Sequence, residues 1–337
     1  MLDATLKALA RLRAHDASRL GQGLSPENAQ ACLHQSIRPL NRESLLAAVE
    51  RAQPLPTSIA IVVPYGVFTT PIEWTAIAVA GGASVHLKAP AMDASLVKTM
   101  AEIFSEEGLP VRWSAERTLP PVDAIIAFGS DESVADLRAA NPNVSFAGYG
   151  HKFSLAYISG DPVVAARTLA MDVVRYDGRG CMAPVAVFCS ADCTALAESM
   201  ADALRNAESI WPRGTVDSAL GPEWRRRMGL GRVMGQVWVG SQWAVTVTPV
   251  EYFTPASLPR MVNIHPVQSA EHMSELLEPW RPWLSTLGTD SSDVNLPGVH
   301  RFSRLGWMQA PTIPREHDGR LMLGGLHSSS NGDDGCG

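Results

Sequence analysis

Apolar runs alternate with segments of helical periodicity through the first half of the chain. Continuous runs rich in β-branched residues occupy positions 58–64 and 83–88, and an apolar segment of helical length, 72–80, separates them. A third run, 124–128, follows a helical pattern at 93–107. Strands that are apolar on both faces and alternate with helices are typical of a parallel sheet covered on both sides. The pattern predicts an α/β fold.

The second half repeats this pattern after residue 154. A helical pattern at 161–176 precedes a strand at 185–189 and another helix at 195–207. Alternating residues from 238 to 250 and the run 261–266 add further strands. We therefore predict two tandem three-layer α/β domains with mostly parallel sheets. The predicted segments are N-terminal helices over 1–55, a first domain over 56–155, a second over 156–300, a return segment over 301–327 and a disordered tail over 328–337.

Length and composition limit the class of protein. A chain of 337 residues with 46% hydrophobic and 18% charged residues can bury a sizeable core and divide into two domains. Its net charge of -6 and pI near 5.9 give no electrostatic footprint for nucleic acid. The dense basic run, residues 225–227, is typical of a solvated helix face. We expect no nucleic-acid partner.

Neither a leader nor a membrane span is predicted. Residues 1–12 are amphipathic and basic, without the apolar core and cleavage site of a signal peptide. No stretch reaches the roughly 18 apolar residues that cross a bilayer. Five cysteines, an odd number without a secretory leader, argue against a disulfide framework and for a reducing compartment. The expected location is the cytoplasm.

Cys181 is the candidate nucleophile. It ends the segment Tyr-Asp-Gly-Arg-Gly-Cys, in which glycines flank Arg179 and allow close approach by a substrate. The alternative is a small buried side chain before an apolar run. Cys189 and Cys193 lack this context and are expected to be core and surface thiols. Their spacing also lacks the paired cysteines and histidines of a zinc site, so no metal is predicted.

Ligands of doubly wound sheets bind at the carboxyl ends of the strands. Three loops follow the predicted strands of the first domain, at residues 64–70, 88–91 and 129–132. We expect these loops to surround a ligand site.

Several segments, taken in order, resemble the acyl-CoA reductase branch of the aldehyde dehydrogenase superfamily, which includes the bacterial bioluminescence fatty acid reductase component. The resemblance covers about residues 55–320, and its order and spacing are more specific than any one motif. The matching segments are Val-His-Leu-Lys-Ala-Pro at 85–90, Phe-Gly-Ser-Asp-Glu-Ser-Val at 128–134, Phe-Ala-Gly-Tyr-Gly-His-Lys-Phe-Ser at 146–154, the nucleophile segment at 177–184, Glu-Tyr-Phe-Thr-Pro at 251–255, and residues 304–311 with 317–319.

This resemblance implies a nucleotide cofactor and a catalytic cysteine. Cys181 becomes the nucleophile of the second, catalytic domain. His151 is either a proton donor to the product alkoxide or a hydrogen-bonded loop histidine. The first domain becomes the cofactor-binding one. The implied cofactor residues are Lys88 at the adenosine ribose, Gly129 and Ser130 at the nicotinamide, Glu251 and Phe253 at the second ribose, and Pro64.

Three positions depart from the superfamily pattern. Gly148 stands where hydrolytic members carry a glutamate that activates water, which favours a reductase. Gly66 replaces an asparagine that stabilises the oxyanion, so either other donors such as the Cys181 N–H suffice or activity is weak. Ala91 replaces a glutamate that contacts the ribose hydroxyls in NAD-preferring members. Its small size leaves room for a 2'-phosphate near Lys88 and favours NADPH, with NADH as the alternative.

The resemblance predicts NADPH-dependent reduction of an acyl-CoA or acyl-carrier-protein thioester to an aldehyde through an acyl-cysteine. One alternative is a NAD-linked acylating aldehyde dehydrogenase or a related acyl-phosphate reductase. Another is a non-catalytic member that binds a carrier protein or partner. A homo-oligomer and a complex with a partner subunit both remain open.

Other residues are read as structural. The segment Gly-Leu-Gly-Arg-Val-Met-Gly at 229–235 is close to a dinucleotide fingerprint, but it follows no strand, so we predict a turn. Trp74 and Trp307 are expected to be packing residues. His317 next to Asp318 is compatible with either a catalytic or a structural role.

Overall fold

The computed structural model describes residues 1–326, except residues 22, 250–252, 254 and 256–257. The chain forms two compact units. Unit 1 contains Met1–Gln22, Gln30–His151 and the described residues from Thr312 onward, and unit 2 contains Gly23–Ala29 and Lys152–Pro311. No helix in the described part of the chain is both long and apolar enough to span a membrane.

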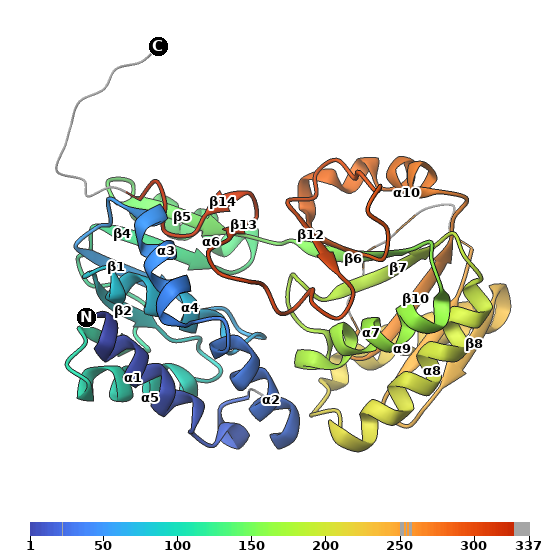
Figure 1. The fold of residues 1–337 in the computed structure, drawn as a ribbon, viewed down its shortest axis with the longest axis horizontal. Coiled ribbons are helices and arrows are strands. Elements are labelled where there is room, and N and C mark those ends of the chain that lie inside the picture. The colour runs from blue at the N-terminus through green and yellow to red at the C-terminus, as the bar shows by residue number, and fades with distance from the viewer. Residues whose placement is uncertain (22, 250–252, 254, 256–257, 327–337) are drawn as a thin grey trace, which may run out of the picture. The chain divides into compact units, whose positions relative to one another are not determined.

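Unit 1 is a parallel sheet with helices (Figure 1). Its strands are β1 (Ser58–Val62), β2 (Ser84–Lys88), β3 (Val111–Ser114), β4 (Ala124–Phe128) and β5 (Ser145–Tyr149), and a small pair, β13 (Glu316–His317) and β14 (Arg320–Leu321), follows from the C-terminal segment. Its helices are α1 (Leu2–Arg13), α3 (Arg42–Ala52), α4 (Thr70–Ala80), α5 (Ser95–Glu106) and α6 (Asp131–Ala140); α2 (Pro26–Ile37) begins in unit 2 and continues in unit 1.

The five-stranded sheet has the order β3-β2-β1-β4-β5, with all pairs parallel. The chain moves from β1 through β2 to β3 and then returns to the other side of β1. Right-handed crossovers therefore put α4 and α5 on one face and α6 on the other. Leu137 of α6 accordingly packs with Ala60 and Ile125. The direction of winding reverses between β1 and β4, which is where such sheets bind ligands.

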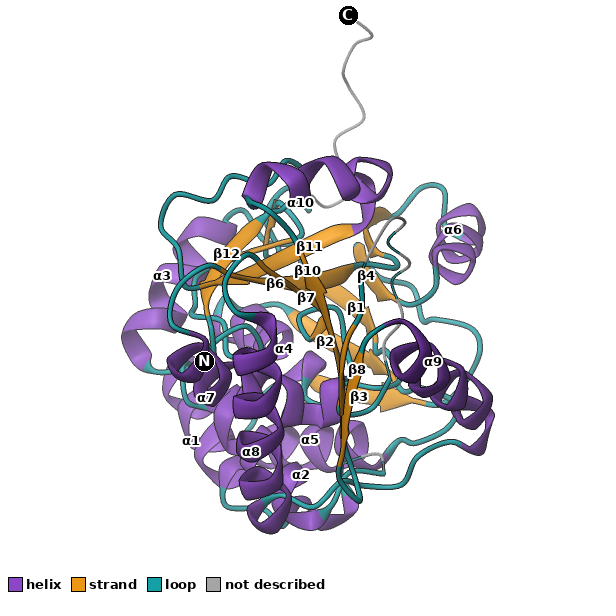
Figure 2. Ribbon diagram, turned by 90° about the vertical axis from the view of Figure 1, so that its right-hand side faces the viewer, coloured by secondary structure: helices purple, strands orange, loops and turns teal. Residues whose placement is uncertain are grey.

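Unit 2 contains a seven-stranded sheet (Figure 2). Its strands are β6 (Phe153–Ile158), β7 (Pro184–Cys189), β8 (Gln236–Val239), β9 (Ala244–Val247), β10 (Met261–Pro266), β11 (Leu284–Thr289) and β12 (Arg301–Arg304). Its helices are α7 (Pro162–Val174), α8 (Cys193–Ile210), α9 (Gly221–Met234) and α10 (Ala270–Leu276). The order is β12-β11-β6-β7-β10-β9-β8, and only the β8–β9 pair is antiparallel among these described strands.

Alternation along the strands of unit 2 separates two hydrophobic cores. Ile158 and Val187 face α7 and α8, where they pack with Leu169 and Met200. The neighbouring residues point the other way, and their core contains Phe188 with Met273 and Leu277 at α10. The predicted α/β class with mostly parallel sheets is confirmed.

The predicted turn at 229–235 is wrong, because α9 continues to Met234. Gly231 is there for close packing: a Cβ at this position would lie 2.5 Å from a methyl group of Val237 and 3.1 Å from that of Thr246. The segment 238–250 was predicted as one strand. It instead contains the end of β8 and the whole of β9, which pair with each other as a hairpin. Strands β3, β5, β6, β11 and β12 were not predicted from the sequence.

Candidate active site

The turn before Cys181 has an unusual backbone. Tyr176, Asp177, Gly178 and Gly180 adopt positive φ values of 52°, 54°, 72° and 91°. Glycine adopts such values readily, whereas non-glycine residues in sparsely populated conformations store strain and persist only where their surroundings hold them. The turn leads directly into β7, and Cys181 precedes that strand by three residues. Its side chain is partly buried.

Ser154 anchors the backbone of Cys181. The Ser154 hydroxyl donates to the Cys181 carbonyl oxygen at 2.5 Å and accepts from the backbone N–H of Thr286 at 3.0 Å. Ser154 is fully buried on β6, so it joins Cys181 to β6 and β11. This role could not be predicted from the sequence, because a serine inside an apolar strand has no distinctive pattern.

Asp172 fastens residues 304–311, here called the C-terminal signature segment, to α7. Its carboxylate accepts from the backbone N–H groups of Gly306 at 2.5 Å and Met308 at 3.0 Å. Gln309 donates to the carbonyl oxygens of Asp172 and Arg175, and Arg175 donates to that of Gly306. Asp172 is fully buried, and burial raises its pKa to about 6. This aspartate was also missed from the sequence.

The predicted cofactor residues of unit 1 lie at the carboxyl edge of its sheet. Lys88 ends β2 opposite Val62 of β1, and its Nζ donates to the Ala89 carbonyl oxygen at 2.7 Å. Pro64 follows β1, and Gly129 follows β4 and donates its N–H to the Tyr149 carbonyl oxygen at 3.2 Å. Ser130 caps α6 by accepting from the N–H of Ser133.

Lys88, Pro64, Gly129 and Ser130 therefore lie at the ends of strands or directly after them, at the carboxyl edge of one sheet. This is the arrangement expected for a nucleotide site. The exposed N-terminal turn of α6 and the amine of Lys88 offer donors of the type that a nucleotide phosphate requires. These residues fit a dinucleotide cofactor.

Gly66 has φ +119°, a conformation that side chains with a Cβ rarely adopt. The space around it is open, since a Cβ would meet nothing within 4 Å. Backbone conformation, not crowding, therefore favours glycine at this position. An asparagine introduced at 66 would be strained.

An aromatic cluster lies at the ends of β4 and β5. Phe128 stacks on Tyr149 with ring centroids 5.1 Å apart, and Trp74 packs edge-on against Phe128. His317 packs edge-on against Tyr149 at 4.7 Å, and its Nδ1 contacts the Arg315 guanidinium at 2.8 Å. Burial raises the pKa of Tyr149 to about 12. Trp74 is thus the packing residue that was predicted, and His317 belongs to this packed cluster.

Trp307 is different from Trp74, because 46% of its surface is exposed. The predicted packing role of Trp307 therefore does not extend to full burial. It follows Gly306, whose N–H is bound to Asp172, on the segment that this carboxylate holds.

His151 is exposed, and its backbone N–H donates to Asp131 Oδ1 at 2.7 Å. It ends unit 1, whereas Cys181 belongs to unit 2, and its catalytic role stays a prediction. Glu251 lies outside the described residues. Phe253 is buried in the unit 2 core with Phe153 and Phe188, and its carbonyl oxygen accepts from the Trp280 indole N–H at 3.1 Å.

The remaining cysteines of unit 2 match their structural interpretation. Cys189 is buried at the end of β7, and Cys193 is the partly buried first residue of α8. Among the described side chains, no group of three or more His, Cys, Asp or Glu residues is arranged to hold a metal ion.

A family model described as "Acyl-CoA reductase (LuxC)" matches residues 114–328, which is more than half of the chain. The chain belongs to the LuxC acyl-CoA reductase family. The matched region includes Ser154, Asp172 and the turn that ends at Cys181. The resemblance stated from the sequence is therefore confirmed, and family membership supports reduction of an acyl substrate to an aldehyde in general terms.

Solved structures confirm the aldehyde dehydrogenase fold for this LuxC family member. An oxidoreductase from Marinobacter aquaeolei is 12% identical with a TM-score of 0.75, and the match covers 96% of this chain and 82% of that one. A NAD-dependent aldehyde dehydrogenase from Sinorhizobium meliloti is 14% identical (TM-score 0.67; 90% and 74% covered). An acetylating aldehyde dehydrogenase from Geobacillus thermoglucosidasius is 13% identical (0.66; 92% and 83%). None of the curated proteins searched matches the sequence.

Proposed function

We propose that this protein reduces an acyl-CoA or acyl-carrier-protein thioester to an aldehyde with NADPH, through an acyl-Cys181 intermediate. One observation carries the proposal: a partly exposed cysteine ends a strained, glycine-rich turn within the region that matches the LuxC family. Such turns persist where a side chain must be presented in a fixed direction.

In the proposed mechanism, the Cys181 thiolate attacks the thioester carbonyl carbon, and the carrier thiolate leaves and takes up a proton. When bound, the nicotinamide would supply a hydride to the acyl carbon, and the carbonyl oxygen would become an alkoxide. The hemithioacetal hydroxyl then returns its proton to His151 as the carbon–sulfur bond breaks, which releases the aldehyde and restores the Cys181 thiolate. Lys88, Pro64, Gly129 and Ser130 hold the cofactor, and the fixed turn orients the sulfur. His151 is proposed to donate the proton to the alkoxide.

Position 148 has no carboxylate to activate water, and it has little room for one. A Cβ on Gly148 would lie 2.4 Å from a Val134 methyl carbon and 2.9 Å from the Phe146 ring. Hydride addition does not require a base that deprotonates water, whereas hydrolysis of an acyl-enzyme does. This favours the reductase over an oxidising dehydrogenase.

The proposed NADPH preference gives a test at Lys88. Replacement of Lys88 by alanine removes the cation that is proposed to contact a 2'-phosphate, so we expect the Kd for NADPH to rise about tenfold and that for NADH to rise less. Fluorescence titration with both cofactors measures the two values. Lys98→Ala, which removes an exposed lysine on α5, is the control. Equal weakening of both cofactors would contradict a 2'-phosphate contact.

The function itself is tested by turnover. The protein is incubated with NADPH or NADH and with acyl-CoA thioesters, acyl-carrier-protein thioesters or acyl phosphates, and both cofactor oxidation and aldehyde are measured. The proposal expects aldehyde from a thioester and faster oxidation of NADPH. Turnover of acyl phosphates alone would favour the acyl-phosphate reductase, and the absence of turnover with every substrate would favour the non-catalytic binding protein.

A further inference from the structure

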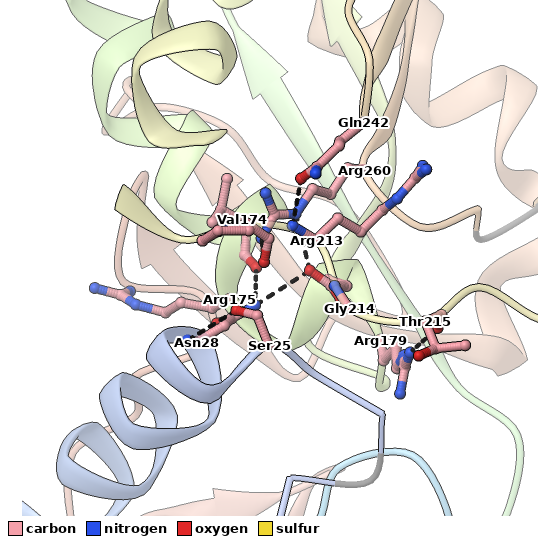
Figure 3. A network of polar contacts seen from close by, with 12 residues as sticks. Ser25, Asn28, Val174, Arg175, Arg179, Arg213, Gly214, Thr215, Gln242 and Arg260 are labelled. Carbon is pink, nitrogen blue, oxygen red and sulfur yellow. Dashed lines mark hydrogen bonds and ion pairs between the residues drawn. The ribbon is translucent and has the colours of Figure 1, made fainter. Parts of the chain in front are cut away.

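A buried carboxylate lies four residues before the candidate nucleophile. The side chain of Asp177 has 0% exposure. Its Oδ1 accepts from Arg260 Nε at 2.8 Å and from Asn28 Nδ2 at 3.1 Å, and its Oδ2 accepts from the backbone N–H of Gly214 at 3.0 Å. Figure 3 labels Asn28, Arg260 and Gly214 within one network of polar contacts. The carboxylate therefore has three donors from three separate segments of unit 2.

Arg260 and Asn28 are themselves fixed. Arg260 has φ 52°, it is 1% exposed, and its Nη2 donates to the Pro212 carbonyl oxygen at 3.2 Å. Asn28 is buried in the first turn of α2, and its Nδ2 also donates to the Val174 carbonyl oxygen at 3.0 Å. A buried ion pair with an Arg is costly to break, because removal of one partner leaves an uncompensated charge. The pair therefore holds two left-handed residues, Asp177 and Arg260, in one arrangement.

The loop around Gly214 contacts the turn at a second point. Thr215 accepts from Arg179 Nη2 at 3.1 Å through its carbonyl oxygen, and its N–H donates to the Gly23 carbonyl oxygen at 2.7 Å. The Gly214 position admits no side chain, since a Cβ would lie 1.9 Å from the Gly23 carbonyl oxygen. This loop thus binds both Asp177 and Arg179, which lies two residues before Cys181.

We propose that Asp177 is a positioning residue for the nucleophile: its carboxylate, held by Arg260, Asn28 and Gly214, fixes the left-handed turn that presents the Cys181 sulfur. The proposal rests on the proposed function of Cys181. Ser154 holds the backbone on the other side of the turn, at the Cys181 carbonyl oxygen. The contacts of Asp177 and of Ser154 thus fix the backbone at residues 177 and 181, and the residues between them are held in one conformation. Loss of either set of contacts would let the Cys181 sulfur move.

A purely structural role for the ion pair makes a different prediction. If Asp177 only stabilised the fold, its substitution would lower stability and leave the reactivity of Cys181 in the folded protein unchanged. A positioning role lowers that reactivity in protein that is still folded, and it lowers kcat with little change in KM for the thioester. A displacement of about 1 Å is sufficient to cost on the order of a hundredfold in rate.

Two variants test the positioning role of Asp177, one by altering its carboxylate and the other by removing one of its hydrogen-bond donors. In Asp177→Asn, an amide N–H₂ faces the donors of Arg260 or Gly214, so the turn loses at least one contact. Asn28→Ala removes one neutral donor and leaves the ion pair, so it remains folded even where Asp177→Asn does not. Asp202→Asn is the control, since Asp202 pairs with Arg205 on the exposed surface of α8.

The experiment uses the full chain and measures the second-order rate of Cys181 alkylation by iodoacetamide through peptide mass spectrometry, together with kcat, KM and thermal unfolding. We expect alkylation and kcat to fall by about a hundredfold in Asp177→Asn and about tenfold in Asn28→Ala, with KM and the control unchanged. Adding Arg260→Gln to Asp177→Asn supplies an acceptor for the new amide and should restore part of the alkylation rate.

The outcomes separate the two proposals. If Cys181 of the unmodified protein is alkylated no faster than free N-acetylcysteine, the role of Cys181 as an activated nucleophile fails, and the role of Asp177 fails with it. If Cys181 reacts faster than the free thiol, and folded Asn28→Ala and Asp177→Asn react within twofold of the unmodified protein, only the positioning role is overturned. Where Asp177→Asn does not fold, the Asn28→Ala rate alone decides.

Discussion

Replacement of Cys181 by alanine is expected to abolish aldehyde formation from thioesters, with a rate loss on the order of 10⁴-fold or more. Cys189 and Cys193 cannot substitute for it. Cys189 is the last residue of β7 and Cys193 begins the following helix, whereas Cys181 precedes β7, and a strand of six residues is about 20 Å long. NADPH binding should be retained, because Lys88, Gly129 and Ser130 belong to unit 1.

Cys193→Ala is the matched control for this prediction. It removes a partly buried thiol from the same unit and should leave both turnover and NADPH binding unchanged. Steady-state rates and cofactor titrations on the two variants provide the comparison. Substantial aldehyde formation by Cys181→Ala would show that the acyl group is not carried by this residue. Joint loss of turnover and NADPH binding would mean that the substitution has a wider effect than removal of the nucleophile.

The second large effect is expected at Asp172, on stability. Both of its carboxylate oxygens accept backbone N–H groups, from Gly306 and Met308. In Asp172→Asn, one of these N–H groups faces the amide N–H₂ and is left without an acceptor. A buried donor without a partner costs about 1–3 kcal/mol. We therefore expect a lower free energy of unfolding, with the C-terminal signature segment loosened from α7.

This loss should depend on pH in a defined direction. The pKa of Asp172 is raised to about 6 in the folded protein, whereas an unfolded aspartate has a pKa of about 3.9. Between these values the folded state holds a proton that the unfolded state has released, so the contribution of Asp172 to stability is lost as pH rises from about 4 to about 6. The difference of roughly two units corresponds to about 3 kcal/mol. An asparagine has no such titration.

The measurement is urea unfolding of both proteins between pH 4 and 7. We expect Asp172→Asn to destabilise the protein most near pH 4 and less at pH 7. The comparison between proteins is needed because burial lowers the pKa of His265 to about 4, which makes stability rise with pH over nearly the same range. That contribution cancels between the two proteins. Parallel stability curves would contradict the raised pKa of Asp172.

The sequence predicted the fold class and the carboxyl-edge loops because these depend on local pattern. Strands β1 and β4 are nearly continuous apolar runs, and β2 alternates buried and partly buried residues. The residues that follow these strands come together by the rules of parallel sheets. β5 was missed because Gly148 and its partly exposed neighbours interrupt the apolar pattern. β12 has alternating half-exposed residues at the edge of its sheet and was missed for a similar reason.

The contacts that hold the turn before Cys181 could not be predicted from local sequence pattern. Asp177 contacts Arg260, 83 positions away, and Asn28, 149 positions away. Tyr176 and Arg260 adopt left-handed conformations that their residue types do not favour. Gly231 illustrates the same limit. In the sequence this glycine looks like part of a turn, whereas in the structure it allows α9 to pack closely against β8 and β9. Only tertiary contacts distinguish these cases.

The most direct test of the proposed function is the intact mass of the protein after incubation with acyl-CoA and acyl-carrier-protein thioesters in the absence of cofactor. We expect one acyl group to be added to Cys181, to be absent in Cys181→Ala, and to be discharged as aldehyde when NADPH is added. No adduct with any thioester, or an adduct on another residue, would contradict the proposed function.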